Sequence, residues 1–430
     1  MIQWHHCRQA WLNREITGEV AVSKRIIAGQ LLKEVGSGVC GLVPGAVVVQ
    51  DEVITDVIEG EIPLSADAGG KQALVCPGFL DAHLHLPQFD IIGAHGLGLM
   101  NWLSRVTFPA EERWSDPSFA DGMTRQATQQ LLASGTTAFA GYATVHHDAT
   151  RAAIKCIESS GMKAAVGQVL MNRNAIPALC RSTSQLLQEA ASLADAYPHK
   201  GRVEFAVTPR FAVACTEDLL LGAGALAAEK KTLIQTHLAE TIPECQQVSE
   251  LFGNASYVDV YQRTNLLGSK SIMGHGVHLT ADEMKALEET GTVVAHCPVA
   301  NSFLRAGMMS RSRLQSSGVR VALGSDIGAG YERSMVRVAR AMVETASALG
   351  ADFPSAAEAW HLITAGNADA IGWSEVGRLR AGASADLLVV QPDIPWLASS
   401  VDPLGMLMFG WDDRWISQTM VRGKVCFRRG

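Results

Sequence analysis

The sequence predicts an α/β fold: a (β/α)8 TIM barrel joined to a small β-sandwich domain that the N- and C-terminal segments form together. The first observation is a set of eight apolar, β-branched runs, at residues 73–83, 136–142, 163–171, 202–209, 232–240, 270–277, 291–298 and 318–326. Helix-like segments separate these runs, and neither end of the chain shows a helical pattern. Near-continuous apolar strands that alternate with helices indicate a parallel sheet closed into a barrel. An open, doubly wound sheet is the alternative.

The segments between the predicted strands carry helix-favouring residues at helical spacing. Clear examples lie at residues 118–135, 216–231 and 280–291. In the last of these, Glu283 follows Thr280 by three residues, which is the signature of a capping box at the start of a helix. Strands and helices therefore alternate through the middle of the chain.

The two ends of the chain do not fit the barrel pattern. Short strands around turns are predicted at residues 45–62, 377–396 and 416–428. Because both ends are β-rich and flank a helix-rich middle, we expect them to pair with each other. The predicted domains are a barrel at residues 73–376 and a β-sandwich assembled from residues 1–72 and 377–430.

Composition excludes several classes of protein. The 430 residues are 47% hydrophobic, which allows a large core, and the net charge of -7 without a Lys/Arg-rich run argues against a nucleic-acid binder. Residues 1–20 lack the apolar region of a secretory signal, and apolar stretches such as 219–228 are too short to span a membrane. Nine cysteines without a CxxC pair suit reduced thiols. We therefore expect a cytoplasmic protein.

Titratable side chains gather where the predicted barrel strands end. His83 and His85 close the first strand two residues apart, so they project from the same face. The later strands add His237 and Glu240, His275 and His278, His296, and Asp326. The C-terminal ends of barrel strands share one mouth, where active sites form. A barrel interior otherwise takes Val, Ile and Leu, so packing alone does not explain this set.

Metal-assisted hydrolysis is the chemistry that needs such a set. Imidazoles and a carboxylate hold a divalent cation and leave a position for water. The metal lowers the pKa of that water toward about 7, and a second carboxylate can carry protons to the substrate. Taken alone, an HxH pair fits a metal site and fits one core histidine beside one surface histidine equally well. The prediction of a metal site therefore depends on the whole set.

The arrangement of HxH at strand one, His at strands five and six and Asp at strand eight resembles the amidohydrolase superfamily. The resemblance extends through "GRLRAGASADLLVV" at 377–390 and implies a metal site whose ligands are His83, His85, His237 and Asp326. Strand four lacks the lysine that binuclear members require, which implies a single divalent ion, zinc by default and iron as the alternative. Glu240, three residues after His237, is typical of the deaminase branch.

Within that branch the chain resembles the guanine deaminases. The stretches that carry this resemblance are "HLHLPQ" (83–88), "LGLMNWLSRVTFPAEERW" (97–114), "TPRF" (208–211), "HCPVANSFL" (296–304) and "GSDIGAGYERSM" (324–335). It implies hydrolysis of an exocyclic C–N bond of a purine, with Glu240, His275 and Asp326 as catalytic residues, and it implies a homodimer. The implied substrate-binding residues are Gln88, Trp102, Leu103, Arg210, Phe211 and His275. Ala300 and Gly98 depart from the usual pattern and bear on substrate preference.

Several alternatives stay open. The substrate could be another heterocycle, such as 8-oxoguanine, a pterin, a triazine or an adenosine derivative, although "GSDIGAG" at 324–330 favours guanine over the last two. A cyclic amidase would need the missing lysine, and a non-catalytic scaffold would not need a complete ligand set. Arg210 is read alternatively as an ion-paired barrel arginine. We expect His296 to support the site indirectly, and His146 and His147 to lie at its rim without a part in the chemistry.

Overall fold

The computed structural model describes residues 24–429, so the prediction about a signal at residues 1–20 lies outside the described part. The eight barrel strands are β5 (Phe79–His85), β6 (Thr136–Tyr142), β7 (Lys163–Gly167), β9 (Val203–Pro209), β10 (Leu233–Leu238), β11 (Ser271–His275), β12 (Val293–His296) and β13 (Arg320–Leu323). Neighbouring strands pair in parallel and in sequence order, and the short β8 (Val169–Leu170) extends the pairing with β9. The predicted barrel is confirmed.

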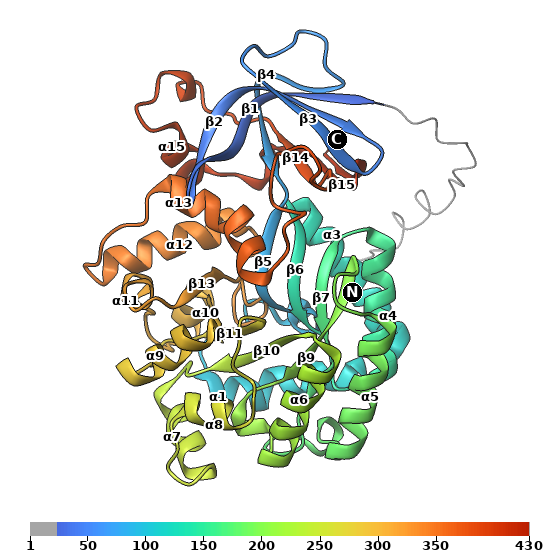
Figure 1. Cartoon of the computed structure of the whole chain (residues 1–430), viewed down its shortest axis with the longest axis vertical. Helices are drawn as coiled ribbons and strands as arrows, with labels where there is room; N and C mark the ends of the chain where they lie inside the picture. The colour runs from blue at the N-terminus through green and yellow to red at the C-terminus, as the bar shows by residue number, and fades with distance from the viewer. Residues whose placement is uncertain (1–23, 430) are drawn as a thin grey trace, which may run out of the picture.

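Helices cover the outside of this barrel (Figure 1). They are α3 (Pro117–Ala133), α4 (His147–Ser160), α5 (Thr183–Ala196), α6 (Glu217–Lys230), α7 (Ile242–Leu251), α8 (Tyr257–Arg263), α9 (Ala281–Thr290), α10 (Pro298–Phe303), α11 (Arg311–Ser316), α12 (Met335–Ala348), α13 (Ala356–His361) and α14 (Asn367–Ile371). The predicted capping box is present, since the Thr280 side chain accepts from Glu283 N–H and the Glu283 carboxylate accepts from Thr280 N–H. In the described chain, no helix combines the length and apolarity that crossing a bilayer requires.

The barrel closes between its first and last strands through specific hydrogen bonds. Asp326 N–H donates to His83 O at 2.8 Å, directly above the end of β13. Below it, the Asn367 amide donates to both Leu80 O and Leu323 O at 2.8 Å, and its oxygen accepts from Leu323 N–H at 2.8 Å. One buried side chain therefore satisfies the backbone where β5 and β13 diverge.

The terminal segments form a separate sheet at the top of Figure 1. Its strands are β1 (Arg25–Gly36), β2 (Val39–Gln50), β3 (Val53–Glu59), β4 (Ala68–Pro77), β14 (Leu387–Val390), β15 (Ile416–Val421) and β16 (Lys424–Arg428), and α15 (Pro403–Gly410) lies between β14 and β15. Hydrogen bonds from Ile54 N–H to Ala383 O and from Ala385 N–H to Glu52 O, both 2.8 Å, bring the β3 edge against the segment before β14. The sheet therefore curls around an apolar core of its own.

The single strand predicted at residues 73–83 is two strands in the structure. β4 pairs with β1 and β14 in the terminal sheet, whereas β5 pairs with β6 in the barrel. Gly78 lies between them, and a Cβ at this position would overlap the Thr137 side chain. The chain thus passes from one sheet to the other at a glycine, which an unbroken apolar run does not reveal.

A buried ion pair joins two strands at the opposite end of the barrel from the histidines. Lys163 Nζ lies 3.5 Å from Glu204 Oε1 and 3.4 Å from Glu375 Oε1, and it donates to Gly201 O at 2.6 Å. Lys163 and Glu204 are both buried. Removing one partner of such a pair leaves an uncompensated buried charge.

We expect Lys163→Met to destabilise the fold by about 3–5 kcal/mol, because the Glu204 carboxylate would lose its buried cation. The measurement is the midpoint of thermal unfolding against wild type. Lys155→Met is the matched control, since Lys155 is exposed on α4. Equal midpoints for the two variants would show that the ion pair contributes little.

Candidate metal centre and substrate pocket

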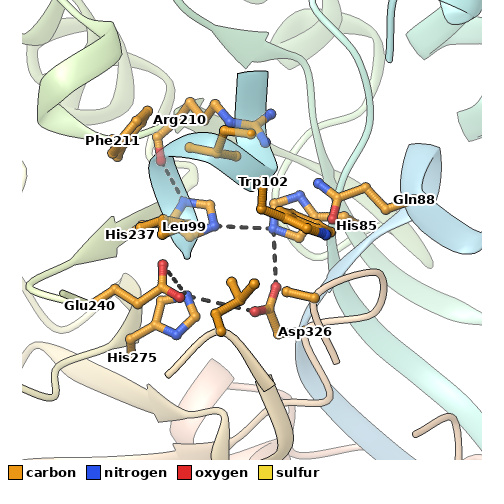
Figure 2. A pocket seen from close by; sticks show the side chains of 13 residues that line it. His85, Gln88, Leu99, Trp102, Arg210, Phe211, His237, Glu240, His275 and Asp326 are labelled. Carbon is orange, nitrogen blue, oxygen red and sulfur yellow. Dashed lines mark hydrogen bonds and ion pairs between the residues drawn. The ribbon is translucent and has the colours of Figure 1, made fainter. Parts of the chain in front are cut away.

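A pocket opens at the C-terminal ends of the barrel strands, where His85, His237, Glu240, His275 and Asp326 converge (Figure 2). All six residues predicted to bind substrate line it, namely Gln88, Trp102, Leu103, Arg210, Phe211 and His275. The strands bring these side chains together from positions that span most of the barrel sequence. All predicted site residues except His83 therefore line one cavity.

Imidazole nitrogens and carboxylate oxygens face one another on the pocket floor. His83 Nε2 and His85 Nε2 each lie 3.4 Å from Asp326 Oδ1, and His85 Nε2 lies 3.1 Å from His237 Nε2. His83, His237, His275 and Asp326 each offer one donor atom within 4.8 Å of the others. This group contains three of the four predicted ligands and has His275 in place of His85, whose Nε2 lies 3.4 Å from Asp326 Oδ1 and 3.1 Å from His237 Nε2.

Hydrogen bonds on the far side of two rings define which nitrogen carries the proton. His237 Nδ1 lies 2.6 Å from Arg210 O, so Nδ1–H donates and Nε2 keeps a free lone pair. His275 Nδ1 lies 2.9 Å from Asn301 Oδ1, so the same holds for its Nε2. In both rings the unprotonated nitrogen faces the pocket floor, which is the orientation that metal ligation requires.

Burial keeps these imidazoles neutral. It lowers the pKa of His85 to about 3, that of His275 to about 4, and that of His237 well below its usual range. Burial alone would raise the pKa of Asp326, but the neighbouring imidazoles of His83, His85 and His275 outweigh burial and hold that pKa well below the usual value. Neutral imidazoles beside an ionised carboxylate are the protonation states of metal ligands.

Two residues hold the β5 and β13 ends in place. The Asp81 carboxylate accepts from His83 N–H at 3.1 Å and from Ser325 N–H at 2.9 Å, and it also pairs with the Ser325 hydroxyl. Asp326 itself adopts a left-handed backbone with φ of 49°. In the sequence, Asp81 looks like part of an apolar strand, which conceals this role. It links the strand that carries the HxH pair to the strand that precedes Asp326.

Glu240 is a second carboxylate that stands apart from the ligand set. Its Oε2 lies 3.5 Å from His275 Nε2, and its buried Oε1 has no hydrogen-bond partner within residues 24–429. Burial raises the pKa of Glu240 well above its usual range, and the nearby Glu244 and Asp326 raise it further. A carboxyl group with a raised pKa can hold a proton at neutral pH and deliver it.

Glu244 positions the backbone around Glu240. Its buried carboxylate accepts from Glu240 N–H at 3.0 Å, from Thr241 N–H at 3.1 Å and from the Tyr257 hydroxyl at 2.7 Å. This contact is the capping box at the start of α7. The predicted proton carrier therefore sits on a loop whose geometry the next helix determines.

A short helical segment covers the pocket from above. It comprises a 3-10 turn (Leu86–Ile91), α1 (Leu99–Trp102), a π-helical turn (Leu103–Thr107) and α2 (Phe108–Glu112). Trp102 donates its indole N–H to Ala94 O at 3.0 Å, which holds the ring in place. Such π-helical turns are frequent at functional sites. Trp102 and Leu103 line the pocket from this segment.

The structure gives Arg210 both of its predicted features. The guanidinium lines the pocket, and its Nη1 also pairs with Glu111 Oε1 at 2.8 Å and Oε2 at 2.7 Å. Gln88 Nε2 donates to the same Glu111 Oε1 at 3.0 Å. Glu111 lies in the stretch "TFPAEERW", but its partner is remote in sequence, so the sequence analysis did not identify it.

The remaining histidines lie outside the pocket. His296 is buried, and neither ring nitrogen has a partner in the described part of the chain; it lines a second cavity beside Arg311. His278 lies 2.7 Å from Ala306 O. His146 and His147 lie at the start of α4 and do not line the pocket. None of these four contributes to the ligand set.

A divalent metal ion fits the donor set. His83 Nε2 is buried without a hydrogen-bond partner among residues 24–429, although it points at the Asp326 carboxylate region. Buried polar atoms without partners are costly, and an ion among them would satisfy several at once. Neutral imidazole nitrogens with one carboxylate oxygen form a ligand set suited to such an ion. Barrel and site together define a metal-dependent hydrolase.

The chain belongs to the amidohydrolase family, whose model matches residues 74–426. It is 33% identical to guanine deaminase from Escherichia coli strain K12 over 374 residues, covering 84% of each chain. It is 31% identical to guanine deaminase from Homo sapiens, covering 74% of this chain and 72% of the human one. A solved guanine deaminase from C. acetobutylicum with guanine in its active site superposes with a TM-score of 0.88 at 27% identity, covering 94% of this chain and all of that one.

Proposed function

We propose that this protein hydrolyses guanine to xanthine and ammonia. The observation that carries the proposal is one pocket that combines a metal-ligand set, a buried carboxyl group with a raised pKa, and two polar side chains at one edge. Glu240 is that carboxyl group, and Gln88 and Arg210 supply the edge. The relatives named guanine deaminases, and the one solved with guanine bound, support the same substrate.

The proposed reaction divides proton transfer between two carboxyl groups. A bound divalent ion would supply Lewis acidity, lowering the pKa of water toward about 7. Asp326, ionised, accepts the proton that the water loses when it attacks C2 of the ring. Glu240, protonated, donates to ring N3 and relieves the charge that develops there. His275 Nε2 accepts a hydrogen bond from the new hydroxyl group. Asp326 then gives its proton to the amine as the C2–N bond breaks, and Glu240 takes the hydroxyl proton as the C2 carbonyl forms, so that ammonia leaves and both carboxyl groups return to their starting states.

The pocket walls suit a flat bicyclic ring. Phe211 and Trp102 offer aromatic faces, and Leu103 adds apolar surface. Gln88 and Arg210 suit the acceptor and donor pattern of a purine edge. A pyrimidine would leave part of this surface uncovered.

We expect guanine to have the highest kcat/KM in a panel with 8-oxoguanine, adenine, cytosine and a pterin. Adenine lacks an amine at C2, and a site whose polar groups lose their partners rejects the analogue. The measurement is ammonia release by purified, metal-restored protein. If 8-oxoguanine or the pterin exceeds guanine by about tenfold, the mechanism survives and the substrate is wrong. Ala300 and Gly98 are then the first positions to vary.

Arg210→Met should lower kcat/KM for guanine by the equivalent of about 1.5–3 kcal/mol of transition-state stabilisation, which is the value of a charge-assisted hydrogen bond. The metal content should stay intact. The same change leaves the buried Glu111 without its cation, so the thermal unfolding midpoint should fall as well. Steady-state kinetics and elemental analysis on one preparation separate the two effects. An unchanged kcat/KM would remove Arg210 from the substrate edge.

The identity of the metal, the oligomeric state, the cellular location and the domain boundaries are further parts of the proposal. Zinc is the proposed ion, because it suits nitrogen and oxygen ligands, and elemental analysis distinguishes it from iron. A homodimer is proposed, with light scattering as its test. A cytoplasmic location is proposed because the cysteines between residues 24 and 429 are all free thiols. Limited proteolysis tests the proposed division into residues 1–72, 73–376 and 377–430, with the first boundary moved to Gly78 because β4 pairs with β1 and β14.

A further inference from the structure

The Glu111 carboxylate connects the two polar residues of the pocket edge. It is buried, accepts from Arg210 Nη1 with both oxygens, and accepts from Gln88 Nε2 with Oε1. Glu111 does not itself line the pocket, so its carboxylate lies behind the Gln88 and Arg210 side chains as seen from the pocket. Its three hydrogen bonds thus act on groups that do.

This contact determines which way the Gln88 amide faces. A carboxylate only accepts hydrogen bonds, so the amide must turn its NH2 group toward Glu111. Gln88 Oε1 is buried and has no partner elsewhere in the described chain. Gly328 packs against the same group, because a Cβ there would lie 2.7 Å from Gln88 Oε1. Gln88 therefore presents a fixed hydrogen-bond acceptor.

The Glu111 carboxylate also determines which N–H donors and how much charge Arg210 presents to a ligand. Nη1 is committed to Glu111, whereas Nε and Nη2 form no hydrogen bond with any residue between 24 and 429. The positive charge is neutralised by a partner at 2.7 Å. Arg210 therefore contributes N–H donors without adding net charge to the pocket, which favours a neutral ligand over an anion.

We propose that Glu111 is a positioning residue that makes the pocket selective for a lactam edge, an N–H beside a C=O. The fixed Gln88 oxygen accepts from the ring N–H, and Arg210 donates to the carbonyl. An amidine edge, with a bare ring nitrogen beside an amine, presents the reverse pattern and leaves both protein groups unpaired. The proposal rests on the proposed function, because guanine carries the lactam edge at N1 and C6.

Glu111→Gln tests this inference with little change of shape. The new amide can donate to Gln88, so the Gln88 amide is free to reverse. The substrates are guanine and 2,6-diaminopurine, which share the C2 amine and differ only in the edge. We expect kcat/KM for guanine divided by kcat/KM for 2,6-diaminopurine to fall by at least about tenfold in this variant. The loss on guanine should lie mainly in KM, because the groups around C2 are untouched.

Glu112→Gln is the matched control, since Glu112 is the exposed neighbour on the same helix. It should keep the wild-type ratio. A purely structural role for Glu111 would lower both activities together and leave the ratio unchanged, and that result overturns the inference. If wild type releases no ammonia from guanine, the proposed function fails instead.

A second variant covers the case in which E111Q does not fold. Glu111→Asp keeps the charge beside Arg210 but is one methylene shorter, so it loosens its hold on Gln88. Its ratio should fall by more than about threefold, and an unchanged ratio overturns the inference. Combining E111D with Gln88→Met should lower the ratio no further than Gln88→Met alone, because the carboxylate acts through that amide.

Discussion

Replacing His237 with alanine is expected to remove both the metal ion and the turnover of the protein. Its Nε2 faces the other donors, and its Nδ1–H bond to Arg210 O holds the ring in that orientation. Without this imidazole the ion loses a ligand, and the pKa of water returns toward its bulk value, which takes hydroxide out of reach at neutral pH. Elemental analysis and ammonia release on the same preparation measure both losses.

His147→Ala is the matched control, because His147 lies away from the pocket, and it should keep wild-type metal and activity. Wild type should contain one ion per chain. A second histidine–carboxylate group among residues 24–429 consists of Glu34, His361 and Asp369. Arg378 already pairs with Glu34 at 3.2 Å and also with Asp369, so these carboxylates have a cation partner. Two equivalents in active protein would contradict the mononuclear site.

Glu240→Gln should retain the metal and lose roughly 10²–10⁴-fold in kcat, the range for a positioned general acid–base group. The amide keeps the size of the side chain but cannot transfer a proton. Burial raises the pKa of Glu240 well above its usual range, which favours the protonated form that the reaction needs first. Single-turnover kinetics measure the loss directly.

Glu250→Gln on the exposed side of α7 is the control for this change, and it should behave as wild type. Near-normal turnover by the Glu240 variant would mean that another group carries the proton. His275 would then be the first alternative, because its Nε2 lies 3.5 Å from the Glu240 carboxylate.

The sequence was sufficient to predict the barrel and the floor of its pocket. Apolar runs mark the strands, and a titratable residue at the end of a buried strand has few structural explanations. His83, His237 and Asp326 are recognisable for that reason, because the strand pattern around each is strong. Parallel pairing then places them at one mouth without any knowledge of side-chain contacts.

Two of the residues that sequence patterns did not reveal, Glu111 and Glu244, share a cause. Glu111 and Glu244 lie on helices, where a glutamate is ordinarily exposed. Glu244 follows Thr241 by three residues, which is a capping-box signature, but that signature does not reveal that the carboxylate is buried. The burial of each glutamate becomes evident only from its partners, Arg210 in one case and Tyr257 in the other. Contacts between distant segments depend on how helices dock on the barrel, and a pattern within one segment does not encode that.

The pairing of β4 with β14 has a consequence for folding during synthesis of the chain. Leu387 pairs with Pro77, so the ribosome must make most of the protein before this contact can form. Until then, β4 presents an unpaired edge directly beside the first barrel strand, and exposed edges invite association between chains. Closing so long a loop is also slow. We therefore expect the nascent polypeptide to need protection late in translation, and C-terminal truncations before residue 387 to accumulate as aggregates.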